Sequence, residues 1–193
     1  MPRATAADAA ATARDVLKQA TELFAARGFA DVSLDDVAQA ANVTRGAVYH
    51  HFRNKAGLFR AVAAQLQAEV ATAVVTAAEA AGEGPHAQLR AGSHAFLDAI
   101  TKGAAARVLL VEAPAVIGWS QWRELDAENS VVHLRQALAE VGVEAELLDA
   151  MTAQLSGAMN EAALWLAERP GDITAHASAH KALDQLLKAV SNS

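Results

Sequence analysis

Cysteine is absent from the 193-residue sequence, and this absence excludes several kinds of chemistry. Without thiols the chain cannot form disulfides, thiolate metal sites or a cysteine nucleophile. The same absence is typical of proteins of the reducing cytoplasm. Because Gly-x-Ser-x-Gly, His-Glu-x-x-His and a phosphate-binding glycine loop are also missing, we expect no enzymatic activity and no cofactor.

Signals for β-strands are scarce as well. The chain has only four prolines and no long alternation of Val, Ile and Thr. Alanine, the strongest helix former, makes up much of the 53% of hydrophobic residues. We therefore predict an all-α fold. The sequence starts without a secretory signal, and no apolar run approaches the roughly 20 residues of a membrane span, so we expect a cytoplasmic protein with no membrane partner.

Charge is distributed unevenly along the chain. Residues 1–60 hold eight Lys and Arg against six Asp and Glu, a net charge of +2. Since the whole chain carries −6, the remaining residues carry −8. A weakly basic N-terminal part on an acidic body suggests a nucleic-acid module joined to a part that does not bind DNA.

Local signals predict the first two helices. Apolar residues recur at helical spacing over 11–27, and Gly28 then fits the left-handed residue that ends a helix. The second helix begins at Ser33, because Ser33 with Asp36 three residues later is a variant of the capping box.

A tight turn is predicted between the second helix and a third. Asn42 tolerates the left-handed conformation that such a turn needs, and Thr44 can cap the next helix. Val48 and Phe52, four residues apart, would face inward. Two short helices joined in this way form a helix-turn-helix, whose second helix enters the major groove of DNA.

The fourth helix is predicted from residues 54–55 to about 81, and it links the two halves without a flexible joint. Movement in one half could therefore be transmitted to the other. Glycines and prolines separate the later helices, which we expect at 86–102, 104–113, 119–141, 144–168 and 172–190.

Residue types suited to DNA gather on the exposed face of the third helix. Arginine can bond O6 and N7 of guanine together, while Tyr and His can bond phosphates or pack on thymine methyls. Glycine lets a helix approach the DNA backbone, and a lysine in the first turn of the fourth helix can reach a phosphate. An ordinary solvated face would expose the same residue types. The candidate contacts are Thr44, Arg45, Gly46, Tyr49, His50, His51 and Lys55.

The stretch from Ala13 to Val62 resembles the DNA-binding domain of TetR-type transcriptional regulators. It carries Phe-x-x-x-Gly-Phe, then Ser-Leu-x-x-Val-Ala, then Thr-x-Gly-x-Val-Tyr-x-His-Phe-x-x-Lys, in the family's order. The resemblance implies double-stranded operator DNA as a partner. It also implies phosphate contacts from Ser33 and Lys55, and recognition contacts from the residues of the third helix named above.

Two positions depart from the family pattern. Asn42 stands where the family usually has glycine, which asparagine can replace in a left-handed turn. Ala56 and Gly57 replace a pair that usually includes a helix-favouring acid. The second departure predicts a less firm start to the fourth helix.

The resemblance also implies two domains and a dimer. We expect a helix-turn-helix domain at 1–60 and a helical effector-binding and dimerisation domain at 61–193. A twofold homodimer would read two inverted half-sites. Apolar stripes on the last two helices are candidates for the dimer interface, although they could instead serve the core of one chain: Leu147, Met151, Leu155, Ala158, Ala162, Leu166, Ile173, Ala177, His180, Leu183 and Leu187.

For an effector pocket we sought aromatic and apolar residues with a few polar groups. The low aromatic content favours a small apolar effector, and plain core packing is the alternative for each residue. The candidates are His94, Phe96, Trp119, Trp122, Met159, Asn160 and Trp165.

Histidine pairs were weighed as metal sites. His176 and His180 lie four residues apart and could meet on one helix face, but a third ligand is not evident. His94 and Asp98 have the same spacing and are interpreted as a surface pair. We therefore predict no metal site.

Three functions remain to be compared. The leading hypothesis is a ligand-responsive repressor that binds an inverted-repeat operator as a dimer. The same fold could act as an activator, or as an adaptor controlled by a partner protein without a small-molecule effector.

Overall fold

The computed structural model describes residues 6–191, and these residues form helices and turns without any strand, which confirms the all-α prediction. The helices of the N-terminal half are α1 (Ala6–Arg27), α2 (Leu34–Ala40), α3 (Arg45–Phe52) and α4 (Lys55–Ala80). Those that follow are α5 (Pro85–Ile100), the π-helix η1 (Ala106–Glu112), α6 (Ala113–Val116), α7 (Trp119–Asp126), the π-helical η2 (Ala127–Val131), α8 (Val132–Glu140), α9 (Leu148–Ala167) and α10 (Ile173–Ser191).

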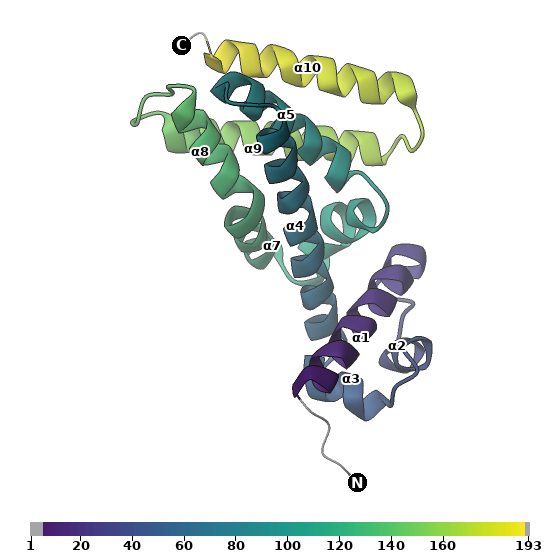
Figure 1. Ribbon diagram of the computed structural model, residues 1–193. Coiled ribbons are helices and arrows are strands. Elements are labelled where there is room, and N and C mark those ends of the chain that lie inside the picture. The colour runs from purple at the N-terminus through teal and green to yellow at the C-terminus, as the bar shows by residue number, and fades with distance from the viewer. Residues whose placement is uncertain (1–5, 192–193) are drawn as a thin grey trace.

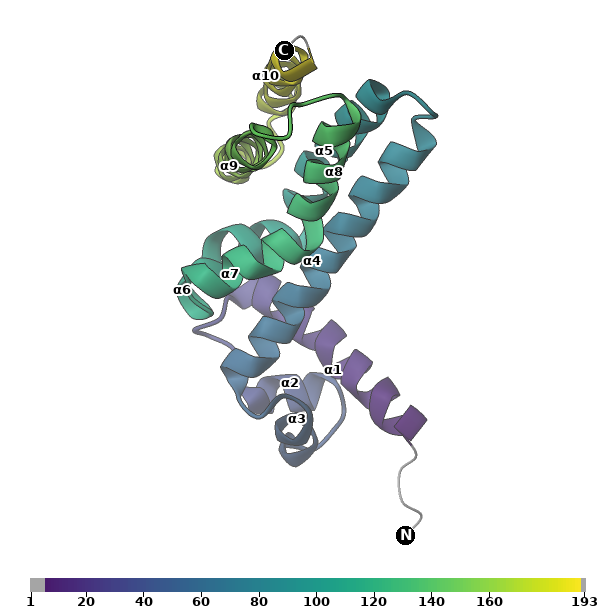
Figure 2. The same ribbon diagram turned by 90° about the vertical axis from the view of Figure 1, so that its left-hand side faces the viewer.

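The long helix α4 runs through the whole molecule. Helices α1–α3 surround its first turns at one end, while α10 lies at the opposite end (Figure 1). Beyond the first turns, α5 packs antiparallel along α4, and α9 and α10 lie side by side on the far side of α5 (Figure 2). The N-terminal helices and the later ones therefore share one continuous element.

The capping signals read from the sequence form as expected. Ser33 Oγ accepts a hydrogen bond from the Asp36 amide at 3.1 Å, and Asp36 Oδ2 accepts from the Ser33 amide at 2.8 Å. Asn42 has φ +53° in the turn, and Thr44 Oγ1 accepts from the Ala47 amide at 3.2 Å. Each contact satisfies an amide that a helix start leaves unpaired.

The N-terminal helices close around three phenylalanines. The rings of Phe24 and Phe29 both meet Phe59 of α4 nearly edge-on, with centroids 5.1 and 5.2 Å away. Val37 of α2 and Val48 of α3 are fully buried beside them. This shared core holds α2 and α3 in a fixed relation to α4.

Gly28 ends α1 with φ +86°, as predicted. A Cβ at this position would lie 2.5 Å from Nη2 of Arg107 and 2.6 Å from Oε1 of Glu112. Besides the strain at this φ, a larger residue would therefore displace the ends of these two side chains from η1.

Several boundaries differ from the prediction. Helix α1 begins five residues earlier than expected, in an alanine-rich stretch of high helix propensity. The segment predicted as one helix at 119–141 is α7, η2 and α8 in direct succession, with a π-helical stretch inside it. Helix α9 begins at Leu148 rather than 144, because residues 144–147 form a turn closed by the Leu147 amide and the Glu144 carbonyl.

Helix α4 also corrects the statement that no segment has the length and hydropathy of a membrane span. Its most apolar 18-residue window has a mean hydropathy of 1.3, which alanine and valine supply. By length and composition alone it could cross a membrane. In the structure it is the central helix, and Leu58, Phe59 and Val62 are fully buried against its neighbours.

Candidate DNA-binding face and effector pocket

The outward face of α3 brings together the side chains predicted to contact DNA. Thr44, Arg45, Tyr49 and His50 are exposed, and Tyr49 retains 61% of its accessible surface although it is a large aromatic residue. His51 is half-buried. Val48 points the other way and is fully buried, so the helix has one face for the core and one for solvent.

Arg45 and Gly46 occupy the first turn of α3. Arg45 Nη1 lies 3.0 Å from Oδ2 of Asp35, but both side chains are about two-thirds exposed. Such a surface ion pair contributes little stability, so the guanidinium can exchange it for a base or a phosphate at low cost. A Cβ at Gly46 would meet only Thr44 Oγ1, at 3.8 Å. The fold itself therefore does not require glycine at this position.

Ser33 and Lys55 have internal roles beside their predicted phosphate contacts. The Ser33 hydroxyl donates to Asp36 at 2.6 Å, and this bond is the main reason that the pKa of Asp36 lies below its usual value. Lys55 Nζ donates to the carbonyl oxygens of Phe29 and Ala30 at 2.8 and 3.3 Å, and sits 4.3 Å from the Phe29 ring centroid. Lys55 thus holds the loop after α1 against the start of α4.

The start of α4 has a firm cap, contrary to what the unusual Ala56–Gly57 pair predicted. Asn54 Oδ1 accepts a hydrogen bond from the Gly57 amide at 2.7 Å. A Cβ at Gly57 would collide with the carbonyl oxygen of Phe52. The glycine is therefore required by the close approach of α3 to α4.

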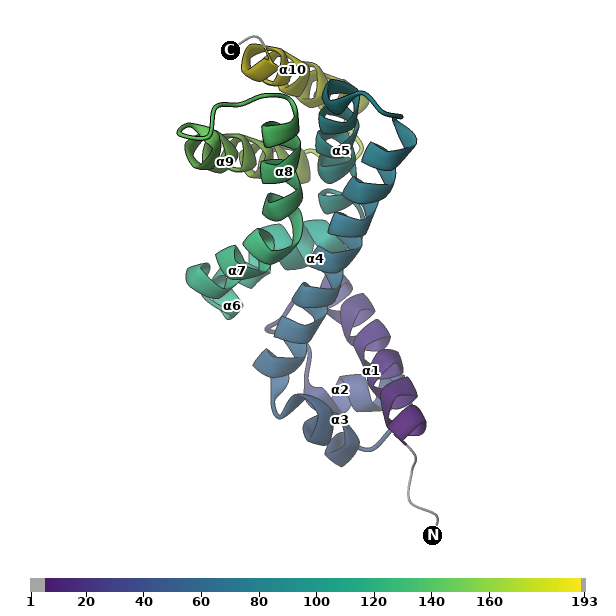
Figure 3. The same ribbon diagram turned by 60° about the vertical axis from the view of Figure 1, so that its left-hand side comes forward.

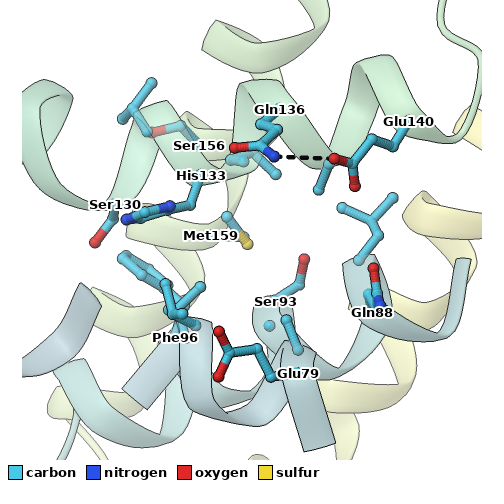
Figure 4. Close-up of a pocket in the computed structure, with 18 of the residues that line it drawn as sticks. Glu79, Gln88, Ser93, Phe96, Ser130, His133, Gln136, Glu140, Ser156 and Met159 are labelled. Atoms are coloured by element: carbon cyan, nitrogen blue, oxygen red, sulfur yellow. Dashed lines mark hydrogen bonds between the residues drawn. The ribbon is translucent and has the colours of Figure 1, made fainter. Parts of the chain in front are cut away.

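A cavity of about 390 Å³ opens between α4, α5, α8 and α9. In Figure 4, Glu79 and Ser93 line one side of it, and His133, Gln136 and Glu140 line the other. A cavity of this size suits a small organic molecule. The residues that line it are Val74, Val75, Ala78, Glu79, Gln88, Leu89, Gly92, Ser93, Phe96, Asp126, Ser130, Val131, His133, Leu134, Gln136, Ala137, Glu140, Ser156 and Met159.

The buried polar residues Asp126 and Ser130 line this cavity. Asp126 is 1% exposed, its Oδ2 accepts from Asn160 Nδ2 at 3.3 Å, and Arg123 Nη1 lies 3.6 Å away. Burial raises the pKa of Asp126 above its usual value. Among the described residues, several buried atoms have no hydrogen-bond partner: Gln67 Nε2 and Oε1, Trp122 Nε1, Asp126 Oδ1, Ser130 Oγ and Asn160 Oδ1. Unpaired buried polar atoms are costly, so the cavity wall at Asp126 and Ser130 favours water or a polar ligand group.

The structure divides the predicted pocket residues into two groups. Phe96 and Met159 line the cavity, Asn160 donates to the lining residue Asp126, and Trp122 is buried one helical turn from Asp126 on α7. The other three do not line it. His94 faces α10, Trp119 is 64% exposed, and Trp165 borders a groove between α9 and α10.

Sequence reasoning missed three polar residues of the cavity wall, Asp126, Ser130 and His133. They lie at i, i+4 and i+7 around the α7–α8 segment, and this spacing of polar residues in a helix was the available signal.

Of the residues predicted to form the dimer interface, some are buried within the chain itself and others lie at its surface. Leu155, Leu183 and Leu187 are buried in the core of the chain itself, and Leu166 packs with Ala175 and Ala179. Leu147, Ile173 and Ala177 are exposed, and Met151, Ala158, Ala162 and His180 are half-buried. Beside them an apolar groove separates α9 from α10, bordered by Trp165 and Leu186, which are both exposed.

Helix η1 connects the later helices to the end of α1. Arg107 Nη1 donates to the carbonyl oxygens of Ala25 and Ala26 at 3.2 and 3.1 Å. Arg107 Nε also donates to Glu112 Oε1 at 3.2 Å. These bonds cap the last carbonyls of α1 with a cation, which is the favourable charge at a helix C-terminus.

An exposed recognition helix after a tight turn, on a helical body with a cavity, defines the class of helix-turn-helix regulators. Residues 16–62 match the family described as bacterial regulatory proteins, tetR family, and residues 86–190 match the tetracyclin repressor-like C-terminal domain. The chain therefore belongs to the TetR family of DNA-binding transcriptional regulators. Members of this family bind operator DNA as dimers and respond to small-molecule effectors.

Individual proteins agree with this assignment. A TetR-family transcriptional regulator from Pectobacterium atrosepticum shares the fold with a TM-score of 0.77 and 32% identity, over 96% of this chain and 97% of that one. The HTH-type transcriptional regulator SrpR of Pseudomonas putida is 46% identical over 67 residues, which are 35% of this chain and 32% of SrpR. The probable acrEF/envCD operon repressor of Escherichia coli is 46% identical over 59 residues, or 31% of this chain and 27% of that repressor.

Proposed function

We propose that the chain is a ligand-responsive repressor that binds an inverted-repeat operator as a homodimer in the cytoplasm. In this proposal residues 1–60 bind DNA, and residues 61–193 hold the effector and the dimer interface. The observation that carries it is the continuity of α4. Its first turn lies against α3, and its Val74, Val75 and Ala78 line the cavity further along.

The DNA contacts follow from the exposed face of α3. Arg45, in its first turn, would reach base edges in the major groove, where an arginine discriminates guanine best. Gly46 would let the helix come close to the DNA backbone. Tyr49 and His50 would contact phosphates or thymine methyls, and Ser33 and Lys55 would contact phosphates from the starts of α2 and α4.

The cavity favours an effector with a mainly apolar body and one polar end. Apolar contacts would come from Leu89, Phe96, Leu134 and Met159. The polar end would meet Asp126, Ser130 and the neighbouring unpaired groups, which offer both donors and acceptors.

Release from DNA would be a population shift. An effector that binds better when α4 and α5 stand apart favours that arrangement by its difference in affinity between the two forms. The shift would reach α1–α3 along α4 and through η1, which grips the end of α1. In a dimer this movement changes the distance between the two recognition helices, which must match the spacing of the half-sites.

The test is selection of the purified protein against random duplex DNA at a stated salt concentration, because phosphate contacts make affinity strongly salt-dependent. We expect an enriched inverted repeat, bound by two chains. The Arg45→Ala variant is the matched control and should enrich a less specific pool. A folded dimer that enriches no sequence would contradict the proposal and favour the adaptor function.

The enriched site then serves to search for the effector. Compounds are scored by release of the labelled operator and by a change in tryptophan fluorescence, since Trp122 lies beside the cavity. A Ser93→Trp variant places a large side chain at the wall of the cavity and should bind the operator while losing the response. An effector that releases wild type and Ser93→Trp equally would place its site elsewhere.

A further inference from the structure

Two helices that are distant in the sequence bring four titratable side chains together at the end of the molecule opposite α1–α3. His94 and Asp98 lie four residues apart on α5, and His176 and His180 lie four residues apart on α10, which packs on α5 (Figures 1 and 3). The structure thus supplies the third group that the histidine pair lacked in the sequence. Asp98 is exposed, as the interpretation of His94 and Asp98 as a surface pair expected, but the hydrogen-bond partners of both side chains lie on α10.

Asp98 lies between the two histidines of α10. Its Oδ1 is 2.8 Å from Nε2 of His176 and 2.9 Å from Nε2 of His180. These three atoms all lie within 4.8 Å of one another. Tetrahedral coordination with bonds of about 2.0–2.1 Å separates ligand atoms by roughly 3.3 Å, so small side-chain rotations suffice to admit an ion.

Hydrogen bonds link His180 to a second histidine and to a carboxylate. His180 Nδ1 lies 2.8 Å from Nδ1 of His94, and His94 Nε2 lies 2.8 Å from Oδ1 of Asp184. A carboxylate only accepts, so His94 Nε2 donates to Asp184. His94 therefore connects His180 to Asp184.

We propose that Asp98, His176 and His180 bind a divalent transition-metal ion. Two imidazoles and one carboxylate form a ligand set that suits zinc and its neighbours in the first transition series. His176 and Asp98 are about half exposed, which leaves the remaining coordination position open to water.

The surroundings of His180 fit this role. With its Nε2 on the metal, Nδ1–H donates to His94, and His94 Nε2–H donates to Asp184. Arg90 holds Asp184 with bonds of 2.6 and 2.8 Å, and it is the main reason that the pKa of this carboxyl falls to about 2. A chain of this kind, from ligand histidine to carboxylate, orients the imidazole and sets its tautomer.

The ion would join α10 to α5. Helix α5 also supplies Ser93 and Phe96 to the wall of the cavity, so an ion that fixes α5 to α10 would stiffen that wall. Because the site contains no residue of the DNA-binding face, zinc binding can be tested without DNA, and its failure would leave the proposed function untouched.

The experiment is calorimetric titration of the untagged, chelator-treated chain with zinc chloride at neutral pH. We expect one ion per chain and a rise in Tm that a chelator reverses. His176→Gln and Asp98→Asn should each weaken zinc binding at least about 10-fold, because each removes a ligand of the ion. Both positions are exposed, and circular dichroism of the metal-free variants should match wild type.

The matched control is His86→Gln, which changes an exposed histidine in the first turn of α5 and should leave zinc affinity unchanged. No zinc binding by the folded wild type would overturn the proposal. So would unchanged affinity in both His176→Gln and Asp98→Asn. Binding that disappears only in a His50→Gln/His51→Gln double variant would move the ion to α3 and would equally overturn it.

Discussion

The backbone N–H of Phe29 donates to Oε2 of Glu112 at 2.7 Å, across 83 positions of the sequence. The same carboxylate accepts from Arg107, whose guanidinium also holds the last carbonyls of α1. Since Glu112 ends η1 and Phe29 follows α1, a displacement of η1 must either move α1 or break these bonds.

Glu112→Ala should therefore weaken the coupling between effector and operator. The change leaves the Phe29 amide without its acceptor, which costs about 1–3 kcal/mol of unfolding free energy. We expect a smaller ratio between operator affinities without and with effector, measured by fluorescence anisotropy. Glu128→Ala, at an exposed position of η2, is the control. A variant with the wild-type ratio would show that the bond from Phe29 to Glu112 is not needed for the coupling.

Arg45→Ala should reduce operator affinity by about 1–3 kcal/mol and relax base preference at one position of each half-site. The reason is the loss of a bidentate donor at the groove, while the Asp35 pair that it breaks is exposed and weak. Affinities for the operator and for single-base variants measure both effects. Arg135→Ala, on α8, removes an equal charge far from α3 and should change neither. A uniform loss across all sequences would assign Arg45 to a phosphate instead.

Asn42 is a non-glycine residue in the left-handed conformation, with φ +53°. Asn42→Gly should leave the stability unchanged or raise it, and Asn42→Ala should lower it by about 1–2 kcal/mol. Denaturant unfolding monitored by circular dichroism gives both values. Equal stability of the Gly and Ala variants would mean that the turn does not constrain the protein.

Asp126→Asn should raise Tm at neutral pH. Burial raises the folded-state pKa of Asp126, so its favourable contribution exists below the unfolded value of 3.8 and is lost as pH rises through the folded value. At neutral pH the buried carboxylate therefore costs stability, and each kcal/mol recovered should add about 2–4 °C.

Thermal melts from acid to neutral pH test this prediction. The gain should shrink toward acid pH, where Asp126 is protonated. Glu124→Gln, at an exposed position of the same helix, should show no such trend. A fall in Tm at neutral pH would mean that Arg123, 3.6 Å away, more than offsets the desolvation of Asp126.

The helix-turn-helix could be predicted from the sequence because its signals act over a few residues. Ser33 with Asp36 caps α2, Thr44 caps α3, and Asn42 adopts the left-handed conformation of the turn between them. Each effect acts within about one helical turn of the residue, so tertiary packing changes it little. The family pattern then gave the order of the helices, which capping residues alone do not.

The cavity and the α5–α10 cluster could not be predicted in the same way. Asp98 meets His176 across 78 positions, and only the packing of α10 on α5 decides which faces meet. Bulky residues misled the search for the pocket. Trp119 and Trp165 lie at the surface, while aliphatic side chains, Phe96, Met159 and several polar groups line the cavity. The leucine stripes of α9 and α10 showed which faces are apolar, but not that the chain itself covers Leu155, Leu183 and Leu187.

Gly28 places a condition on building chimeric regulators from this body. The space that a side chain would need there is taken by Arg107 and Glu112, and the next backbone amide is already bonded to Glu112. A foreign set of first helices fits this body best if it presents glycine, which adopts φ +86° without strain, and an accessible amide at these two positions; otherwise Arg107 and Glu112 must move. The choice of DNA-binding helices that can be joined to this body is therefore restricted by the body itself, and not by the DNA sequence to be bound.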